Sequence, residues 1–174
     1  MDTKALKRPL YGAIGAGLSD LGNFIGVSAP AVDDFQVSLS TPETFFDENM
    51  GAFAVASLEI GDGRLAYLFI STSVAIVAAG KLLMIPDSEI SSRKSEKILD
   101  EEILDAFSEI ANIVAGAASD KVEAAGKKLF FKKTDVASVD TTADPFSVVN
   151  GLVGNVVVGG GKVDLEGTKG TIAL

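Results

Sequence analysis

The segment formed by residues 102–120 constrains the fold most, because its residues fall onto two opposite faces of a helix. At about 100° per residue the apolar side chains gather on one side, and they are Ile103, Phe107, Ile110, Val114 and Ala117. Asp105, Glu109 and Asn112 fall within an arc of roughly 60° on the other side. An amphipathic helix buries its apolar stripe against a core. We therefore expect these three polar side chains to face solvent or a partner.

The polar face alone does not separate a functional site from an ordinary hydrated surface. Acidic residues on exposed helix faces are common, and that interpretation is sufficient for Asp105 and Glu109. Asn112 differs, since an Asn within a helix costs roughly a few tenths of a kcal/mol in propensity relative to Ala. A functional reading of this face needs support from elsewhere in the chain.

Composition excludes several classes of chemistry. The 174 residues are 47% hydrophobic, which predicts one domain with a sizeable core. The chain has no Cys, His or Trp, which excludes disulfides, thiol nucleophiles, the usual zinc and haem sites and histidine acid–base catalysis. A net charge of −9 disfavours nucleic-acid partners. We expect no metal site and no cofactor of the protein's own.

A membrane span is not expected. The longest apolar run, residues 65–80, is shorter than the roughly 20 residues that a spanning helix needs, and it is better interpreted as a strand followed by a helix. The N-terminal residues lack the apolar stretch and cleavage signal of a secretory signal peptide. We expect a cytoplasmic protein.

Periodicity and turn residues predict the order of the elements. A first helix is expected over residues 9–25, a strand at 37–39, and a hairpin of strands 52–60 and 64–70. A helix from about 71 to 84 ends before Pro86, and residues 87–97 are expected to form a linker into the long helix, which Gly126 can terminate. Further strands are expected at 128–132, 136–139, 155–158, 162–165 and 171–174.

Two segments in the first half of the chain align with segments in the second half. Residues 18–25 align without gaps on residues 107–114, with an identical Ser and an identical Asn, and residues 58–67 align on residues 165–174. In both halves a helix that carries an acid and an Asn precedes a hairpin. We therefore expect a single domain, residues 1–174, that consists of degenerate repeats at about 9–84 and 98–174. In the first repeat the acid and the amide are Asp20 and Asn23.

These patterns together predict an α/β fold, specifically an α+β two-layer domain. We expect an antiparallel-rich mixed sheet, with helices 9–25 and 100–125 packed side by side on one face and related by an internal pseudo-twofold repeat. Small residues on both helices, such as Gly15, Ala16 and Gly116, suit a close helix approach.

Asp105, Glu109 and Asn112 match the Asp/Ser-x3-Glu-x2-Asn signature of the CheC/CheX/FliY family of chemotaxis phosphatases. The chain resembles the CheX branch most, and the likeness extends over residues 51–118, from the hairpin to the signature helix. Two departures stand out. A Pro that is common after the signature Asn is missing from Lys133-Thr-Asp-Val136, and the first repeat has Ala16 and Asp20 in the leading and Glu positions.

The resemblance implies a phosphatase for the phospho-aspartate of a CheY-like response-regulator receiver. It implies that Asn112 positions water, that Glu109 pairs with the receiver Lys and that Asp105 supports docking. Asp20 and Asn23 would form a degenerate, non-catalytic half-site. The receiver would supply a divalent metal, Mg. A homodimer through sheet edges is also expected. A non-catalytic receiver-binding or scaffold protein and a purely structural dimer stay open as alternatives, and the cognate receiver and pathway are not specified.

Overall fold

The computed structural model describes residues 3–61, 63–124, 131–144, 146–149, 152 and 154–174. These residues form helices α1 (Thr3–Ile25), α2 (Pro42–Glu48), α3 (Thr72–Leu82), α4 (Asp87–Glu96) and α5 (Glu101–Ala124). The strands are β1 (Val32–Ser40), β2 (Ala52–Ile60), β3 (Arg64–Ser71), β4 (Phe131–Asp140), β5 (Val156–Leu165) and β6 (Thr168–Ala173). No helix in these ranges is long and apolar enough to cross a bilayer.

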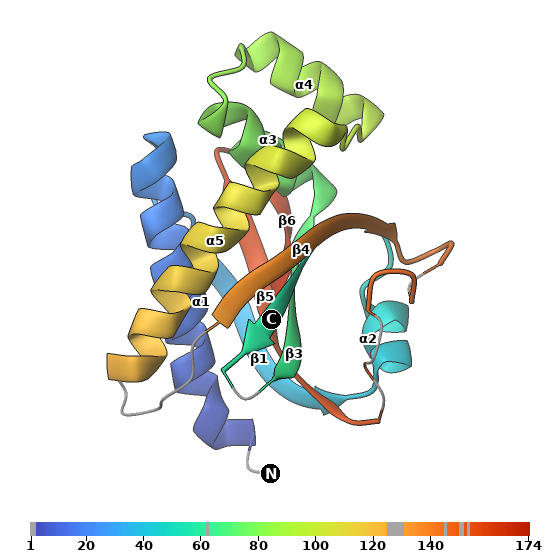
Figure 1. The fold of residues 1–174 in the computed structure, drawn as a ribbon. Coiled ribbons are helices and arrows are strands. Elements are labelled where there is room, and N and C mark those ends of the chain that lie inside the picture. Colours follow the sequence, from blue (N-terminus) through green and yellow to red (C-terminus); the bar gives the residue numbers. More distant parts are fainter. Residues whose placement is uncertain (1–2, 62, 125–130, 145, 150–151, 153) are drawn as a thin grey trace.

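One six-stranded sheet, in the order β1-β5-β6-β3-β2-β4, organises the fold (Figure 1). All five neighbouring pairs are antiparallel. The sheet is therefore fully antiparallel, whereas an antiparallel-rich mixed sheet was expected. The order is symmetric about the central β6–β3 pair: each half contributes a hairpin, and each hairpin is flanked by the first strand of the other half. This symmetry supports the proposal that one domain consists of two degenerate repeats, at about 9–84 and 98–174.

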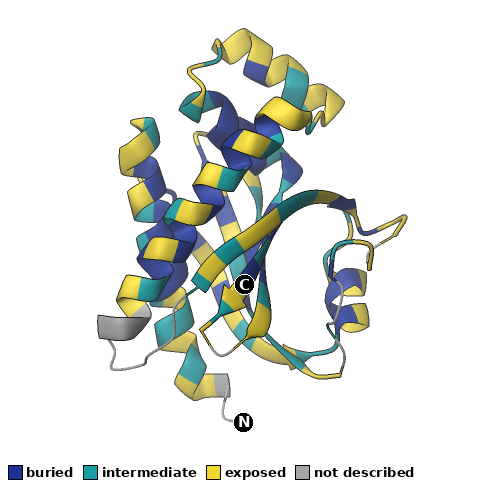
Figure 2. Ribbon diagram, in the orientation of Figure 1, coloured by how far each residue is buried: buried dark blue, intermediate teal, exposed yellow. Residues whose placement is uncertain are grey.

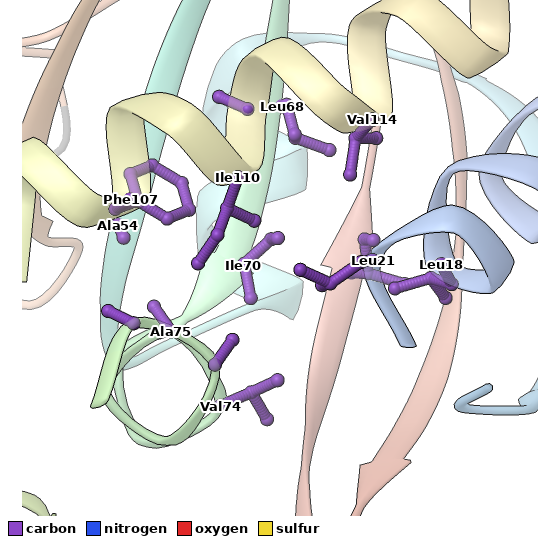
Figure 3. Packing of buried hydrophobic residues seen from close by; sticks show 14 of the residues in the cluster. Leu18, Leu21, Ala54, Leu68, Ile70, Val74, Ala75, Phe107, Ile110 and Val114 are labelled. Carbon is purple, nitrogen blue, oxygen red and sulfur yellow. The ribbon is translucent and has the colours of Figure 1, made fainter. Parts of the chain in front are cut away.

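Helices α1, α3 and α5 cover one face of the sheet and bury the main core. Figure 3 shows how Leu18 and Leu21 of α1, Phe107, Ile110 and Val114 of α5 and Ile70 of β3 converge there. The helices α1 and α5 are antiparallel, since Gly12 lies near Lys121 and Gly17 near Val114. The predicted two-layer α+β fold, with the two long helices side by side on one face, is confirmed.

A second, smaller core lies on the opposite face, which the sequence analysis did not predict. Phe45 and Phe46 of α2 pack there on Phe53 and Phe69 of the central hairpin. The ring centroids of Phe45 and Phe69 are 5.0 Å apart, within the range of favourable aromatic pairs. The buried side of α2 thus covers part of this face.

Residues 87–96 form α4, so the prediction of a linker was wrong. Acidic Asp87 and Glu89 in its first turn and basic Arg93 and Lys94 in its last turn complement the helix dipole. Ile90 is its buried residue, and a Cβ on Gly80 of α3 would lie 2.6 Å from the Ile90 Cγ1. The helix is therefore anchored by one side chain and favoured by its end charges.

Other boundaries also differ from the expectation. The first helix starts at Thr3 and includes Pro9. Strands predicted at 155–158 and 162–165 form one strand, β5, because the glycines between them pack closely: a Cβ on Gly160 would lie 2.8 Å from the Ile172 carbonyl oxygen. Strand β4 likewise joins what was predicted as two strands. The predicted helix end at Gly126 and the residues 128–130 lie outside the described residues.

Candidate functional site

The helix that carries the signature begins at a side-chain cap. Asp100 Oδ1 accepts the backbone N–H of Ile103 at 3.0 Å, as an Asp before a helix typically does. Glu101 and Glu102 lie in the first turn of α5, where negative charge is favourable. The Asp100 cap therefore marks where α5 starts.

Arg93 of α4 ties that start to the rest of the molecule. Its guanidinium donates to Glu89 at 2.8 Å, to Asp100 at 3.0 Å and to Glu102 at 2.9 Å. The hydrogen bonds to Glu89 and Glu102 raise the pKa of Arg93 above its ordinary value. One cation thus links α4 to the first turn of α5 through hydrogen bonds of the charge-assisted kind.

The two faces of α5 separate as predicted. Ile103, Phe107 and Ile110 are 0% exposed, whereas Asp105, Glu109 and Asn112 are exposed. Figure 2 shows the same division, with exposed residues along the outer side of α5 and buried ones toward the sheet. The predicted exposure of the acid, acid, amide stripe is confirmed.

These three side chains are available to a partner. Among the described residues, Asp105, Glu109 and Asn112 take part in no side-chain hydrogen bond or ion pair. Gly116 is exposed and comes one turn after Asn112, and no atom lies within 4 Å of the position its Cβ would take. The surface beside Asn112 therefore carries no side chain at residue 116 and is unobstructed there, which suits contact with a macromolecule.

Strand β4 reaches α5 beside the signature. The Nζ of Lys133 donates to the Oγ of Ser108, the residue before Glu109. Pairing of β4 with β2 shifts register opposite Ser57 and Leu58, where Thr134 is the extra residue, and Thr134 Oγ1 donates to the Ser57 carbonyl at 3.1 Å. This β-bulge lies in residues 133–136, the segment in which the sequence analysis noted a missing Pro. Bulges redirect neighbouring side chains, and here the neighbour is Lys133.

A second contact holds the later part of the helix. Ser119 Oγ donates to the Ala115 carbonyl at 2.8 Å and accepts the Phe131 N–H at 2.8 Å. The sequence analysis singled out neither Lys133 nor Ser119, because each acts through a partner that is distant in sequence. A polar residue on the edge of a helical face is the only local signal for Ser119.

The residues of the expected degenerate half-site lie on α1. Asp20 and Asn23 are exposed, and Ala16 is half-buried. The structure therefore places an acid and an amide on the surface of both long helices, with the leading acid present only on α5. Among the residues that the structure describes, no group of three or more acidic side chains could hold a metal ion.

No protein-family model and no curated protein matches this chain. Solved structures do match it. FliY from Thermotoga maritima is 20% identical, with a TM-score of 0.76 over 99% of this chain and 88% of that chain. FliM in a FliG–FliM complex from H. pylori is 12% identical, with a TM-score of 0.76 over 98% of this chain and 90% of that one.

A CheX chemotaxis protein from Desulfovibrio desulfuricans is 13% identical, with a TM-score of 0.56 over 95% of this chain and 97% of that chain. These likenesses establish the fold, which this chain shares with FliY, FliM and CheX, and they confirm the predicted resemblance to the CheC/CheX/FliY family at that level. The narrower likeness to CheX stays a prediction, because the TM-scores with FliY and FliM are higher.

Proposed function

We propose that this protein is a phosphatase that hydrolyses the phospho-aspartate of a CheY-like response-regulator receiver, in chemotaxis or a related two-component pathway. The observation that carries the proposal is the exposed, unpartnered row of Asp105, Glu109 and Asn112 on α5, within a fold that FliY and CheX share. A receiver substrate implies a cytoplasmic location.

The chemistry suits a chain without His or Cys. Water attacks phosphorus, the bond between phosphorus and the aspartyl oxygen breaks, and the products are inorganic phosphate and a free carboxylate. Such transfer depends mainly on positioning and charge stabilisation. The Asn112 amide can accept from the water and donate at the same time, without a charge that repels the phosphoryl group.

The acidic residues would orient the helix on its partner. Glu109, one turn before Asn112, would form an ion pair with the receiver Lys and so fix the position of Asn112 over the phosphoryl group. Asp105, a further turn back, would support docking. The protein would use no cofactor of its own, since the receiver carries the divalent metal, Mg, that balances the phosphoryl charge.

A non-catalytic role is the second candidate. FliM, with a TM-score of 0.76, was solved in complex with FliG, so this fold also serves in a complex of flagellar proteins. A receiver-binding or scaffold role of this kind would require a docking surface but not the positioned amide. A structural dimer without a receiver partner would require neither Glu109 nor Asn112 on an exposed face.

The direct experiment adds this protein to a panel of phosphorylated receivers from the same cell and follows phosphate release over time. We expect accelerated release from at least one receiver and slower release with the Glu109→Gln variant, whose folding is checked by circular dichroism. Tight receiver binding without faster phosphate release would support the scaffold role, and neither binding nor release would contradict both.

We also propose a homodimer formed through a sheet edge. Strands β1 and β4 are the outer strands of the sheet, and open edges invite pairing with another chain. Light scattering at tens of micromolar should report twice the 18.0 kDa of one chain. A species of single-chain mass under these conditions would contradict the dimer.

A further inference from the structure

A cavity of about 280 Å³ lies where β3 passes into α3, and none of the α5 signature residues lines it. Its polar lining includes Ser71, Thr72, Ser73, Lys94, Lys97 and Lys162. Its size is slightly below the usual range for ligand pockets, about 300–1,000 Å³. A small, polar ligand fits such a space better than a large apolar one.

The first turn of α3 lacks a side-chain cap. Ser71 is the N-cap residue, but it makes no capping hydrogen bond, and its Oγ accepts the backbone N–H of Thr171 at 2.8 Å. The backbone N–H groups of an uncapped first turn remain without intrahelical partners. Together with the helix dipole they form a site that favours an anion.

Thr72 provides a second, independent observation at this site. The residue lines the cavity and is 3% exposed. Its Oγ1 is the buried side-chain atom without a hydrogen-bond partner among the described residues. Buried hydroxyls are nearly always hydrogen-bonded, so this one points to a ligand that would complete it.

The lysines supply positive charge without a direct ion pair. Lys94 donates to the Thr168 hydroxyl at 3.2 Å, and Lys162 donates to the Thr171 hydroxyl at 3.2 Å. Within the described part of the chain, neither these two nor Lys97 lies within ion-pair distance of a carboxylate. In a chain of net charge −9, three such lysines around one helix N-terminus are a marked concentration of positive charge.

Two carboxylates near the lysines offset part of this positive charge. Glu48 belongs to its lining, and Asp140 lies close enough to Lys97 for the lysine charge to contribute to a lowered Asp140 pKa. Three ammonium groups therefore face two carboxylates, and the excess is positive. From these observations we propose that the cavity binds a small phosphate-class oxyanion at the N-terminus of α3, held by the Thr72 hydroxyl and by Lys94, Lys97 and Lys162.

The test is a binding titration of the full chain, so it does not depend on phosphatase activity. Backbone amide NMR shifts are followed while inorganic phosphate, and separately AMP as a phosphomonoester, replaces chloride at constant ionic strength. We expect saturable shifts centred on Thr72, Ser73 and Val74 with at least one of the two ligands. The ligand that gives them shows whether the site takes free phosphate or a phosphomonoester. Linear shifts scattered over surface lysines, or no shifts, would overturn the proposal.

Matched variants test which residues bind the oxyanion. Lys94→Met keeps the apolar stem and should weaken binding about tenfold, as loss of a charge-assisted hydrogen bond does. Thr72→Val should also weaken binding, while leaving the fold as stable as before or more so, because it removes an unpartnered buried hydroxyl. Lys132→Met, at an exposed position on β4 outside the cavity, should bind normally. Equal losses at Lys132 and Lys94, or none at Thr72, would contradict the assignment.

Discussion

Gly17 of α1 lies directly against Val114 of α5. A Cβ on Gly17 would come within 2.8 Å of the Val114 Cγ1 and 3.0 Å of its Cα, which is closer than carbon atoms pack. The two helices can therefore approach this closely only because residue 17 has no side chain. Val114 follows Asn112 by two residues, so the contact also supports the helix that carries the proposed site.

Gly17→Ala should destabilise the protein. The methyl group would meet backbone atoms of α5, and overpacking of this kind costs about 1–3 kcal/mol, which outweighs the gain in helix propensity of up to about 1 kcal/mol. Gly15→Ala is the matched control on the same helix, since nothing lies within 4 Å of that Cβ position, and it should be neutral or stabilising. Urea unfolding of both variants measures the difference, and equal effects would contradict the close approach.

Thr141 should matter for stability through its hydroxyl. Its Oγ1 accepts the Gly51 N–H at 2.8 Å and lies 3.1 Å from the carbonyl oxygens of Asn49 and Gly51. Thr141→Val keeps the shape but leaves the Gly51 N–H without this partner, at a cost of about 1–3 kcal/mol. Thr141→Ser keeps the hydroxyl and should cost less in thermal unfolding. A larger loss in the Ser variant would exclude the hydrogen bonds as the cause.

The carboxyl of Asp140 should titrate below its ordinary range. Hydrogen bonds from the Thr142 hydroxyl at 2.6 Å and the Thr142 N–H at 2.9 Å lower its pKa. Because the folded pKa is below the unfolded value of about 3.9, this group stabilises the fold above that pH and loses its contribution as pH falls through the folded pKa. Carboxyl NMR titration should show the pKa rising toward the ordinary value in Thr142→Val. An unchanged pKa would contradict this cause.

Local signals predicted the parts of the fold that follow sequence periodicity. The helical period of residues 102–120 predicted α5 and its exposed face, and the predicted hairpin of strands 52–60 and 64–70 corresponds to β2 and β3. Helix α2 was missed although its start is signalled by Thr41, whose side chain caps the helix, and by Pro42 in the first turn. The acidic first turn and basic last turn of α4 were a similar helix signal, but the sequence analysis predicted a linker there.

Contacts between distant residues could not be predicted in this way. The bulge at Thr134 depends on pairing of β4 with β2, and the hydrogen bond from Lys133 to Ser108 depends on how β4 crosses α5. The anion cavity joins side chains of β3, α3, α4 and β5. None of these three arrangements leaves a periodic trace in the sequence, because each depends on the tertiary packing.

The central claim is that Asn112 on α5 positions the attacking water, whereas Asn23 on α1 does not. Both residues are exposed, so Asn112→Ala and Asn23→Ala should fold alike, and the two variants are matched in chemistry. The measurement is the decay rate of a phosphorylated receiver at equal concentrations of each variant. Asn112→Ala should slow it by orders of magnitude, as loss of a positioning group can, and Asn23→Ala should change it little. Equal losses, or no loss at Asn112, would contradict the account.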